Sequence, residues 1–92
     1  KKDWDGAIAC WEKLLPNAKS ETYKAKIAHD LAVAYEIKEN IEKAYEYSNK
    51  ALEFFMNSII VDYQHFMFVV EHNNTLKLRL ADQKTLKKQL GE

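Results

Sequence analysis

The sequence predicts an all-α fold of antiparallel helical hairpins, and three observations lead to that prediction. The chain of 92 residues contains only two glycines and one proline, so helices meet few breaks and the turns of a sheet lack the residues they need. Apolar residues recur at spacings of three and four, which place them on one face of a helix. The segment Trp4–Leu15 also resembles Ile41–Leu52. We therefore expect four to five helices in a single domain over residues 1–92.

The first helix is predicted over Trp4–Leu15. Asp3 is a residue of the N-cap type, whose side-chain oxygen accepts a hydrogen bond from a free backbone N–H of the first turn. Pro16 cannot continue a helix interior, so residues 16–20 are expected to form a loop. Ser20 then caps the next helix. The inward face of the first helix consists of Trp4, Ala7, Ile8, Trp11, Leu14 and Leu15.

The next two helices are predicted to form a hairpin. The second helix runs from Glu21 to about Lys38, with its apolar residues mostly on one face. Glu39-Asn40 is expected to form a tight turn, because asparagine tolerates the left-handed backbone conformation. The third helix opens at Ile41 and continues through Phe55. A connection this short makes the two helices antiparallel neighbours.

The pattern after Met56 leaves three alternatives open. Asn57-Ser58 can cap a new helix from Ile59 to about Glu71, or the third helix can run straight through. The β-branched residues 59–61 also permit a strand, although the chain offers no partner strand for it.

The C-terminal part is predicted to contain a loop and a last helix. His72-Asn73-Asn74 has the polar composition of a loop, and Thr75 is expected to cap the helix that follows. Gly91 should end that helix. Its inward residues are expected to be Leu76, Leu80, Leu86 and Leu90.

Composition restricts the partners of this chain. It carries 14 basic and 14 acidic residues, and Lys and Glu alternate instead of forming the basic stripe that displaces phosphate counterions. We therefore expect no nucleic-acid partner. The most apolar stretch, residues 54–70, is interrupted by polar side chains, so no membrane span is expected either.

Small and aromatic residues of the hairpin resemble a known family. Leu31-Ala32, Tyr35, Ala44 and Ala51 stand at the spacing of the tetratricopeptide-repeat (TPR) signature. Alanines at these positions allow two helices to approach closely. The resemblance implies a short right-handed TPR-like solenoid. It would contain one complete repeat at about residues 25–56, a partial repeat at 3–15 and C-terminal capping helices at 58–90.

The resemblance also implies a function, a non-catalytic protein–protein interaction or scaffold module. TPR proteins hold a peptide or a partner's helix on the wall formed by their first helices, which places the candidate contacts at Lys26, His29, Val33 and Ile37. The alternative is a structural C-terminal helical cap of a larger repeat protein, because the last helix carries a charged face.

A looser resemblance bears on location. The Trp-x-x-Ala-Ile opening and the Leu-Ala-Val-Ala-Tyr-Glu core are similar to the C-terminal region of TPR-containing lipoproteins of Bacteroidota-type bacteria. That resemblance implies the cell envelope, and a cytoplasmic location stays open.

The polar residues predict no catalysis, no metal site and no cofactor. His29, His65 and His72 fall on different predicted segments, whereas a metal site needs three or four converging ligands. Cys10 lies in an apolar run and is expected to be a buried thiol without an activating base. The two glycines stand alone, so the chain has no phosphate-binding loop.

The apolar residues exceed what one small core needs. Residues 66–70 are consecutive and apolar, so a helix through them is apolar on all sides and one side should meet something beyond this core. The partial repeat also lacks its first helix, and we expect an upstream segment to supply it. Self-association as a homodimer is the expected consequence. The residues expected to mediate it are Trp4, Trp11, Phe66 and Val70.

Overall fold

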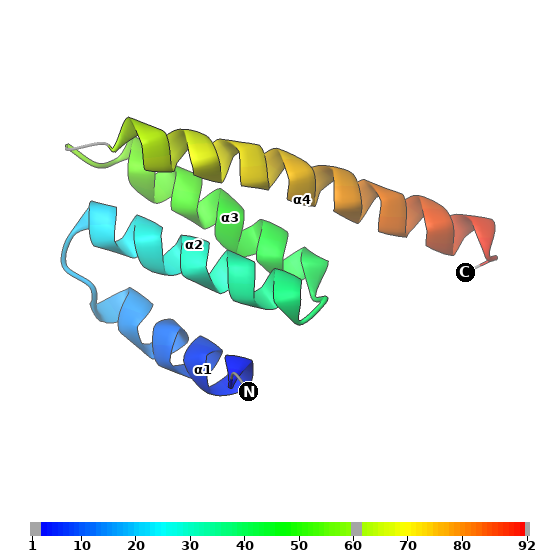
Figure 1. Ribbon diagram of the computed structural model, residues 1–92, viewed down its shortest axis with the longest axis horizontal. Coiled ribbons are helices and arrows are strands. Elements are labelled where there is room, and N and C mark those ends of the chain that lie inside the picture. Colours follow the sequence, from blue (N-terminus) through cyan, green and yellow to red (C-terminus); the bar gives the residue numbers. More distant parts are fainter. Residues whose placement is uncertain (1–2, 60–61, 92) are drawn as a thin grey trace.

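The computed structural model describes residues 3–59 and 62–91, and this part of the chain is all-helical. Four α-helices follow one another: α1 (Trp4–Leu14), α2 (Glu21–Ile37), α3 (Ile41–Met56) and α4 (Tyr63–Gln89). They lie side by side in chain order, with α1 at one end of the row and α4 at the other (Figure 1). The prediction of an all-α fold with four to five helices is therefore confirmed at the level of helix content and number.

The start of each of the first two helices agrees with the sequence. Asp3 caps α1 by accepting a hydrogen bond from the backbone N–H of Gly6 at 2.9 Å. Ser20 caps α2 in the same way, through the N–H of Tyr23 at 2.9 Å. The connection around Pro16 is not wholly irregular, because Leu15–Asn17 forms one turn of 3-10 helix. Proline suits that turn, since its missing N–H would have no partner at a helix start.

The α2–α3 turn corrects one detail of the prediction. The left-handed residue is Glu39, with φ of 65°, and not Asn40, which has φ of −96°. Asn40 is the N-cap of α3, and its Oδ1 accepts a hydrogen bond from the backbone N–H of Lys43 at 3.2 Å. An N-cap residue adopts a non-helical backbone with negative φ, so the left-handed conformation falls on the residue before it.

Alanines bring α2 and α3 into close contact. Ala25, Ala28 and Ala32 on α2 have no exposed surface, and neither do Ala44 and Ala51 on α3. Side chains this small let two backbones approach closely and leave larger residues to fill the remaining space. The larger buried residues are Leu31, Ile41, Phe55, Val69 and Leu76.

A separate helix does follow α3, as the first of the three alternatives expected, but its start and its cap differ from that prediction. Helix α3 ends at Met56, and the next helix begins at Tyr63, capped by Asp62 through the backbone N–H of His65 at 3.2 Å. Ile59, the predicted start of a helix or strand, is 99% exposed in the connection. The rest of the strand alternative falls on residues 60–61, which lie outside the described residues.

The predicted loop at His72-Asn73-Asn74 is wrong, because these residues lie in the middle of α4. Two of them are inward-facing and find partners on other helices. His72 Nε2 lies 2.6 Å from Glu36 Oε1, and Asn73 Nδ2 donates to Ser48 Oγ at 3.1 Å and to Asn49 Oδ1 at 2.9 Å. A polar run that looks like a loop in the sequence is therefore a polar seam between helices.

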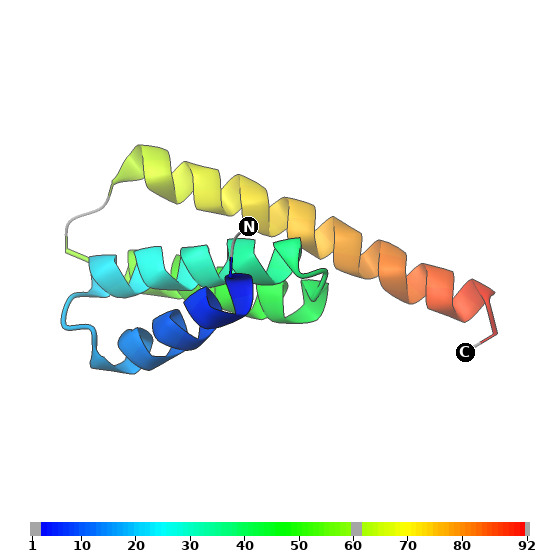
Figure 2. The same cartoon turned by 60° about the horizontal axis from the view of Figure 1, so that its bottom comes forward.

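Two further predictions concern the same helix. Thr75 does not cap it, since its hydroxyl donates to the carbonyl of Glu71 within the helix at 3.1 Å. Gly91 does end it, with φ of 85° and its N–H bonded to the carbonyl of Lys88. Because it has no break, α4 extends well past the α2–α3 turn, as Figures 1 and 2 both show.

Candidate functional site

The exposed strip of α2 is the candidate partner-binding surface. Tyr23, Lys26, Asp30, Val33 and Ile37 follow one another at spacings of three and four, so they share one helix face. We call these five residues the α2 front. Tyr23 is 51% and Ile37 48% exposed, while Val33 is half-buried. Three of the four contacts expected from the sequence, Lys26, Val33 and Ile37, therefore share one accessible face.

The neighbouring faces of α2 are covered. Ile27, Leu31 and Ala34 belong to a cluster that includes Ile8 of α1, whereas Ala25 and Ala28 pack with residues of α3 and α4. The α2 front is thus the side of this helix left open between its neighbours.

His29, the fourth expected contact, lies elsewhere. It is 6% exposed, and its ring centroid lies 5.4 to 5.5 Å from those of His65, Phe68 and His72 on α4. The three histidines that the sequence placed on separate segments therefore meet at one interface. Sequence reasoning missed this cluster because the false loop at residue 72 hid the common helix that carries His65 and His72.

Burial makes His29 hard to protonate. Desolvation first, and then the charges of His72 and His65, lower its pKa from 6.5 to about 4. Among the buried side-chain atoms of the described residues, His29 Nδ1 and His72 Nδ1 have no hydrogen-bond partner. A neutral imidazole is therefore the form that suits this interface.

Glu36 fastens α4 to α2 beside the histidines. Its carboxylate meets His72 Nε2 at 2.6 Å and Arg79 Nη1 at 2.7 Å. Burial opposes its charge, but the hydrogen bonds and charges of His72 and Arg79 outweigh burial and hold the pKa of Glu36 below its usual value. Nearby, partial burial raises the pKa of Asp30, against the opposing influence of His65.

A second polar cluster fastens α1. Glu12 Oε2 accepts hydrogen bonds from the hydroxyls of Tyr35 at 2.7 Å and Tyr47 at 3.0 Å, and the two rings stack with centroids 5.7 Å apart. Burial first, and then the bond to Glu12, raises the pKa of each tyrosine to about 12. This cluster ties one carboxylate of α1 to both helices of the hairpin.

The residues expected to mediate self-association do not form one patch. Trp4 and Trp11 are half-buried against the α1–α2 cluster. Phe66 packs on Phe55 with ring centroids 5.8 Å apart, and Val70 is half-buried on the same helix. The two pairs lie on opposite sides of the hairpin, because α1 and α4 flank it (Figure 1). Self-association through them stays a prediction.

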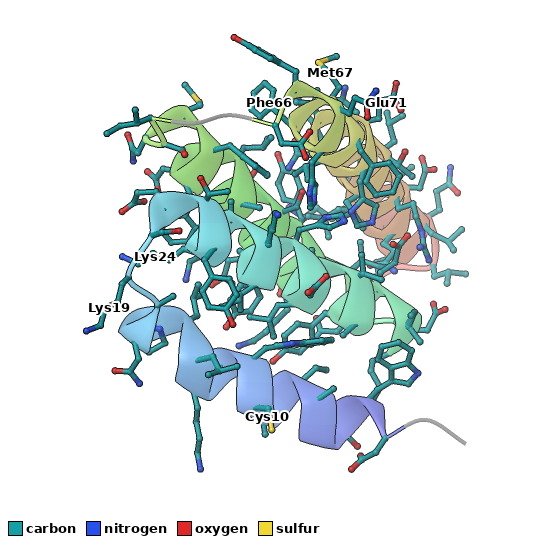
Figure 3. The ribbon with its side chains drawn as sticks, turned by 60° about the vertical axis from the view of Figure 1, so that its left-hand side comes forward. Cys10, Lys19, Lys24, Phe66, Met67 and Glu71 are labelled. Atoms are coloured by element: carbon teal, nitrogen blue, oxygen red, sulfur yellow. The ribbon has the colours of Figure 1, made fainter. Side chains whose placement is uncertain are left out.

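Cys10 is exposed, so the expectation of a buried thiol is wrong. Ile8 and Trp11 of α1 turn toward α2, whereas Ala9 and Cys10 lie on the outer side of the helix, where Figure 3 shows the sulfur. An apolar run in a sequence does not reveal which of its members face out once the helix has only one neighbour.

Over residues 3–59 and 62–91, no group of three His, Cys, Asp or Glu side chains is arranged to hold a metal ion. None of the helices α1 to α4 combines the length and apolarity needed to cross a bilayer.

The fold therefore places this protein in the all-α class. Helices α2 and α3 form an antiparallel hairpin, and α1 and α4 pack on its two sides. A family model described as "Domain of unknown function (DUF6340)" matches residues 1–78, and the chain belongs to that family. The matched range covers α1, α2, α3 and more than half of α4. No curated protein and no solved structure matches the chain.

Proposed function

We propose that this chain is a non-catalytic protein–protein interaction module of the TPR type, which binds its partner on the α2 front. The strongest support is that apolar side chains of the α2 front are exposed on a helix whose other faces are packed against the protein. Tyr23 and Ile37 are about half exposed on a helix whose other faces are buried against α1, α3 and α4. Apolar side chains held on a rigid element are what a protein interface uses as anchors.

The packing supports a solenoid-like arrangement as part of this proposal. Alanines join α2 to α3, and α1 and α4 pack on the two sides of that hairpin. In a stacked-helix protein each unit leans on its neighbours in this manner. The side chains of α2 that remain open would then belong to a continuous binding wall.

The alternative function is a structural helical cap, with α4 as the end of a larger array. A cap needs a polar outer face to keep the array soluble. Leu78, on the side of α4 opposite buried Leu76, is instead 67% exposed. An exposed leucine on that side favours an interaction module over a cap.

Two matched variants test the proposal. Ile37→Glu places a charge on the α2 front, and Met56→Glu makes the same change at a 77% exposed residue at the end of α3. Each protein is immobilised, and partners are captured from a lysate of the source organism and compared by quantitative mass spectrometry.

We expect at least one protein to bind the unchanged chain and Met56→Glu but not Ile37→Glu. Circular dichroism should show the same helix content in all three proteins, because both positions are exposed. Capture that is equal on all three proteins, or the absence of any captured protein, would contradict the proposal.

A further inference from the structure

We propose that the distal part of α4, residues 77–90, is a second docking surface, which binds an acidic amphipathic helix of another protein. We call these residues the α4 overhang. The inference is independent of the α2 front and concerns a different face of a different helix.

The buried seam of α4 continues into the overhang. Val69 and Leu76 are fully buried against the hairpin, and Asn73 between them is hydrogen-bonded to α3. Leu80 and Leu90 follow Leu76 at helical spacings of four and fourteen residues, on nearly the same face. Their exposure increases along the helix, from half-buried at Leu80 to 74% at Leu90.

Burial is lost there because the hairpin ends while α4 does not. Both ribbon views show α4 projecting beyond the α2–α3 turn, with no other helix beneath its last turns (Figures 1 and 2). Leu80, Leu86 and Leu90 form the apolar stripe of the overhang. Leu80 still packs beside Ile41 and Ala44 of α3, whereas no helix of the described residues covers Leu86 and Leu90.

One hollow between α3 and α4 and two shallow ones on α4 lie along the overhang. A cavity of about 220 Å³ lies between α3, at Asn40, Ile41 and Glu42, and α4, at Leu80, Gln83, Lys84 and Lys87. Two more hollows continue along α4, and Gln83 and Leu86 line both of them. An occupant lying along α4 would therefore contact the α2–α3 corner as well as the overhang.

The charge of the overhang defines the chemistry of the occupant. It carries five basic residues, Lys77, Arg79, Lys84, Lys87 and Lys88, and one acidic residue, Asp82. Arg79 already pairs with Glu36 and Glu39. In the part of the chain that the structure describes, no carboxylate forms an ion pair with Lys84, Lys87 or Lys88. A partner helix with leucine-like residues on one face and carboxylates beside them would satisfy both the stripe and these lysines.

Two other occupants fit less well. A second copy pairing its own overhang here would bring two strongly basic helices together, and like charges across an interface are repulsive. An anionic lipid surface would attract the lysines, but it is flat and cannot enter the hollow between α4 and the start of α3. An acidic helix has both the shape and the charge.

A peptide titration tests this. The probe is a fluorescein-labelled peptide of about 18 residues, or five helical turns, with leucines at spacings of three and four and glutamates elsewhere. Its binding to the whole chain is followed by fluorescence anisotropy at low and at physiological salt. The matched control peptide has every glutamate replaced by lysine.

Paired variants make the result specific. Lys84→Glu with Lys87→Glu reverses charge at the hollows, and Lys13→Glu with Lys19→Glu makes the same change at exposed positions on α1 and the loop after it. We expect the first pair to weaken acidic-peptide binding by about tenfold or more and the second to change it by less than about threefold. Leu86→Ser with Leu90→Ser should also weaken it, without loss of helix content, because both residues are exposed.

The proposal would be overturned if the acidic peptide did not bind, if the Lys84→Glu/Lys87→Glu protein bound it equally well, or if the lysine peptide bound equally well. It would also be overturned if phosphatidylserine vesicles displaced the acidic peptide and their own binding depended on Lys84 and Lys87. Dimerisation that Leu86→Ser/Leu90→Ser abolishes would also overturn it, in favour of a second copy. Ile37→Glu should bind the acidic peptide normally, so a failure of the α2 front and a failure of the overhang give different results.

Discussion

Acidification should destabilise this protein through His29, which is buried at the α2–α4 interface. Its pKa falls from 6.5 to about 4 on folding. Between these two values the unfolded chain binds a proton that the folded chain does not, so the free energy of unfolding falls as the pH is lowered. Well above pH 6.5 the residue is neutral in both states and contributes no pH dependence.

The size of the effect follows from the shift. Each pH unit inside the window changes the free energy of unfolding by up to about 1.4 kcal/mol, so moving from about pH 7 to about pH 5 should remove about 2 kcal/mol. A domain of this length has a total stability of roughly 5 to 14 kcal/mol, so the loss is large enough to measure.

One carboxyl group near His29, that of Glu36, titrates below this range. Glu36 has a lowered pKa, so its stabilising contribution is present above about pH 4.5 and is lost as the pH falls through its folded value. Asp30 has a raised pKa and acts in the opposite direction. Measuring at about pH 5 therefore isolates His29 better than a lower pH would.

Urea denaturation at the two pH values, followed by circular dichroism, measures the effect, and His29→Leu is the control. Leucine has a similar volume, cannot titrate and removes a buried nitrogen that lacks a partner. The variant should lose less than about 1 kcal/mol over the same pH change. Equal stability of the unchanged protein at both pH values would contradict this prediction. So would an equal loss of unfolding free energy in His29→Leu and in the unchanged protein.

Three further predictions concern single residues. Glu12→Ala should lower the free energy of unfolding by about 1 to 3 kcal/mol, because two tyrosine hydroxyls lose their acceptor, whereas Glu53→Ala on the exposed side of α3 should change it by less than about 0.5 kcal/mol in the same urea titration. Asn73→Ala should cost about 1 to 3 kcal/mol through its two lost hydrogen bonds, while a loop residue at that position would tolerate alanine without measurable loss. Cys10 should react with a thiol reagent nearly as fast in the native protein as in urea, and strong protection in the native state would show that the thiol is covered.

Local signals in the sequence were sufficient for the first three helices. Asp3 and Ser20 act on backbone groups three residues away, so their capping role is visible without any tertiary structure. The spacing of the hairpin alanines also indicates which faces of the two helices pack together. Helix content and the order of the first elements follow from such local rules.

The last helix could not be predicted because its polar residues depend on partners far away in the chain. His72 and Asn73 look like loop residues until Glu36 and Ser48 are known to face them. Such contacts satisfy polar groups at a helix interface. Because the partners are far apart in the sequence, a local sequence pattern does not predict them. The same dependence hid the histidine cluster, since its members become neighbours only when α4 is continuous across residue 72.

The central functional claim is that the α2 front contacts a partner protein, and site-specific photocrosslinking tests it most directly. A photoreactive amino acid replaces Ile37 in one version of the protein and Met56 in another, and both are expressed in the source organism and irradiated. We expect a defined protein adduct at position 37 and none at position 56. No adduct at position 37, or the same adduct at both positions, would contradict the claim.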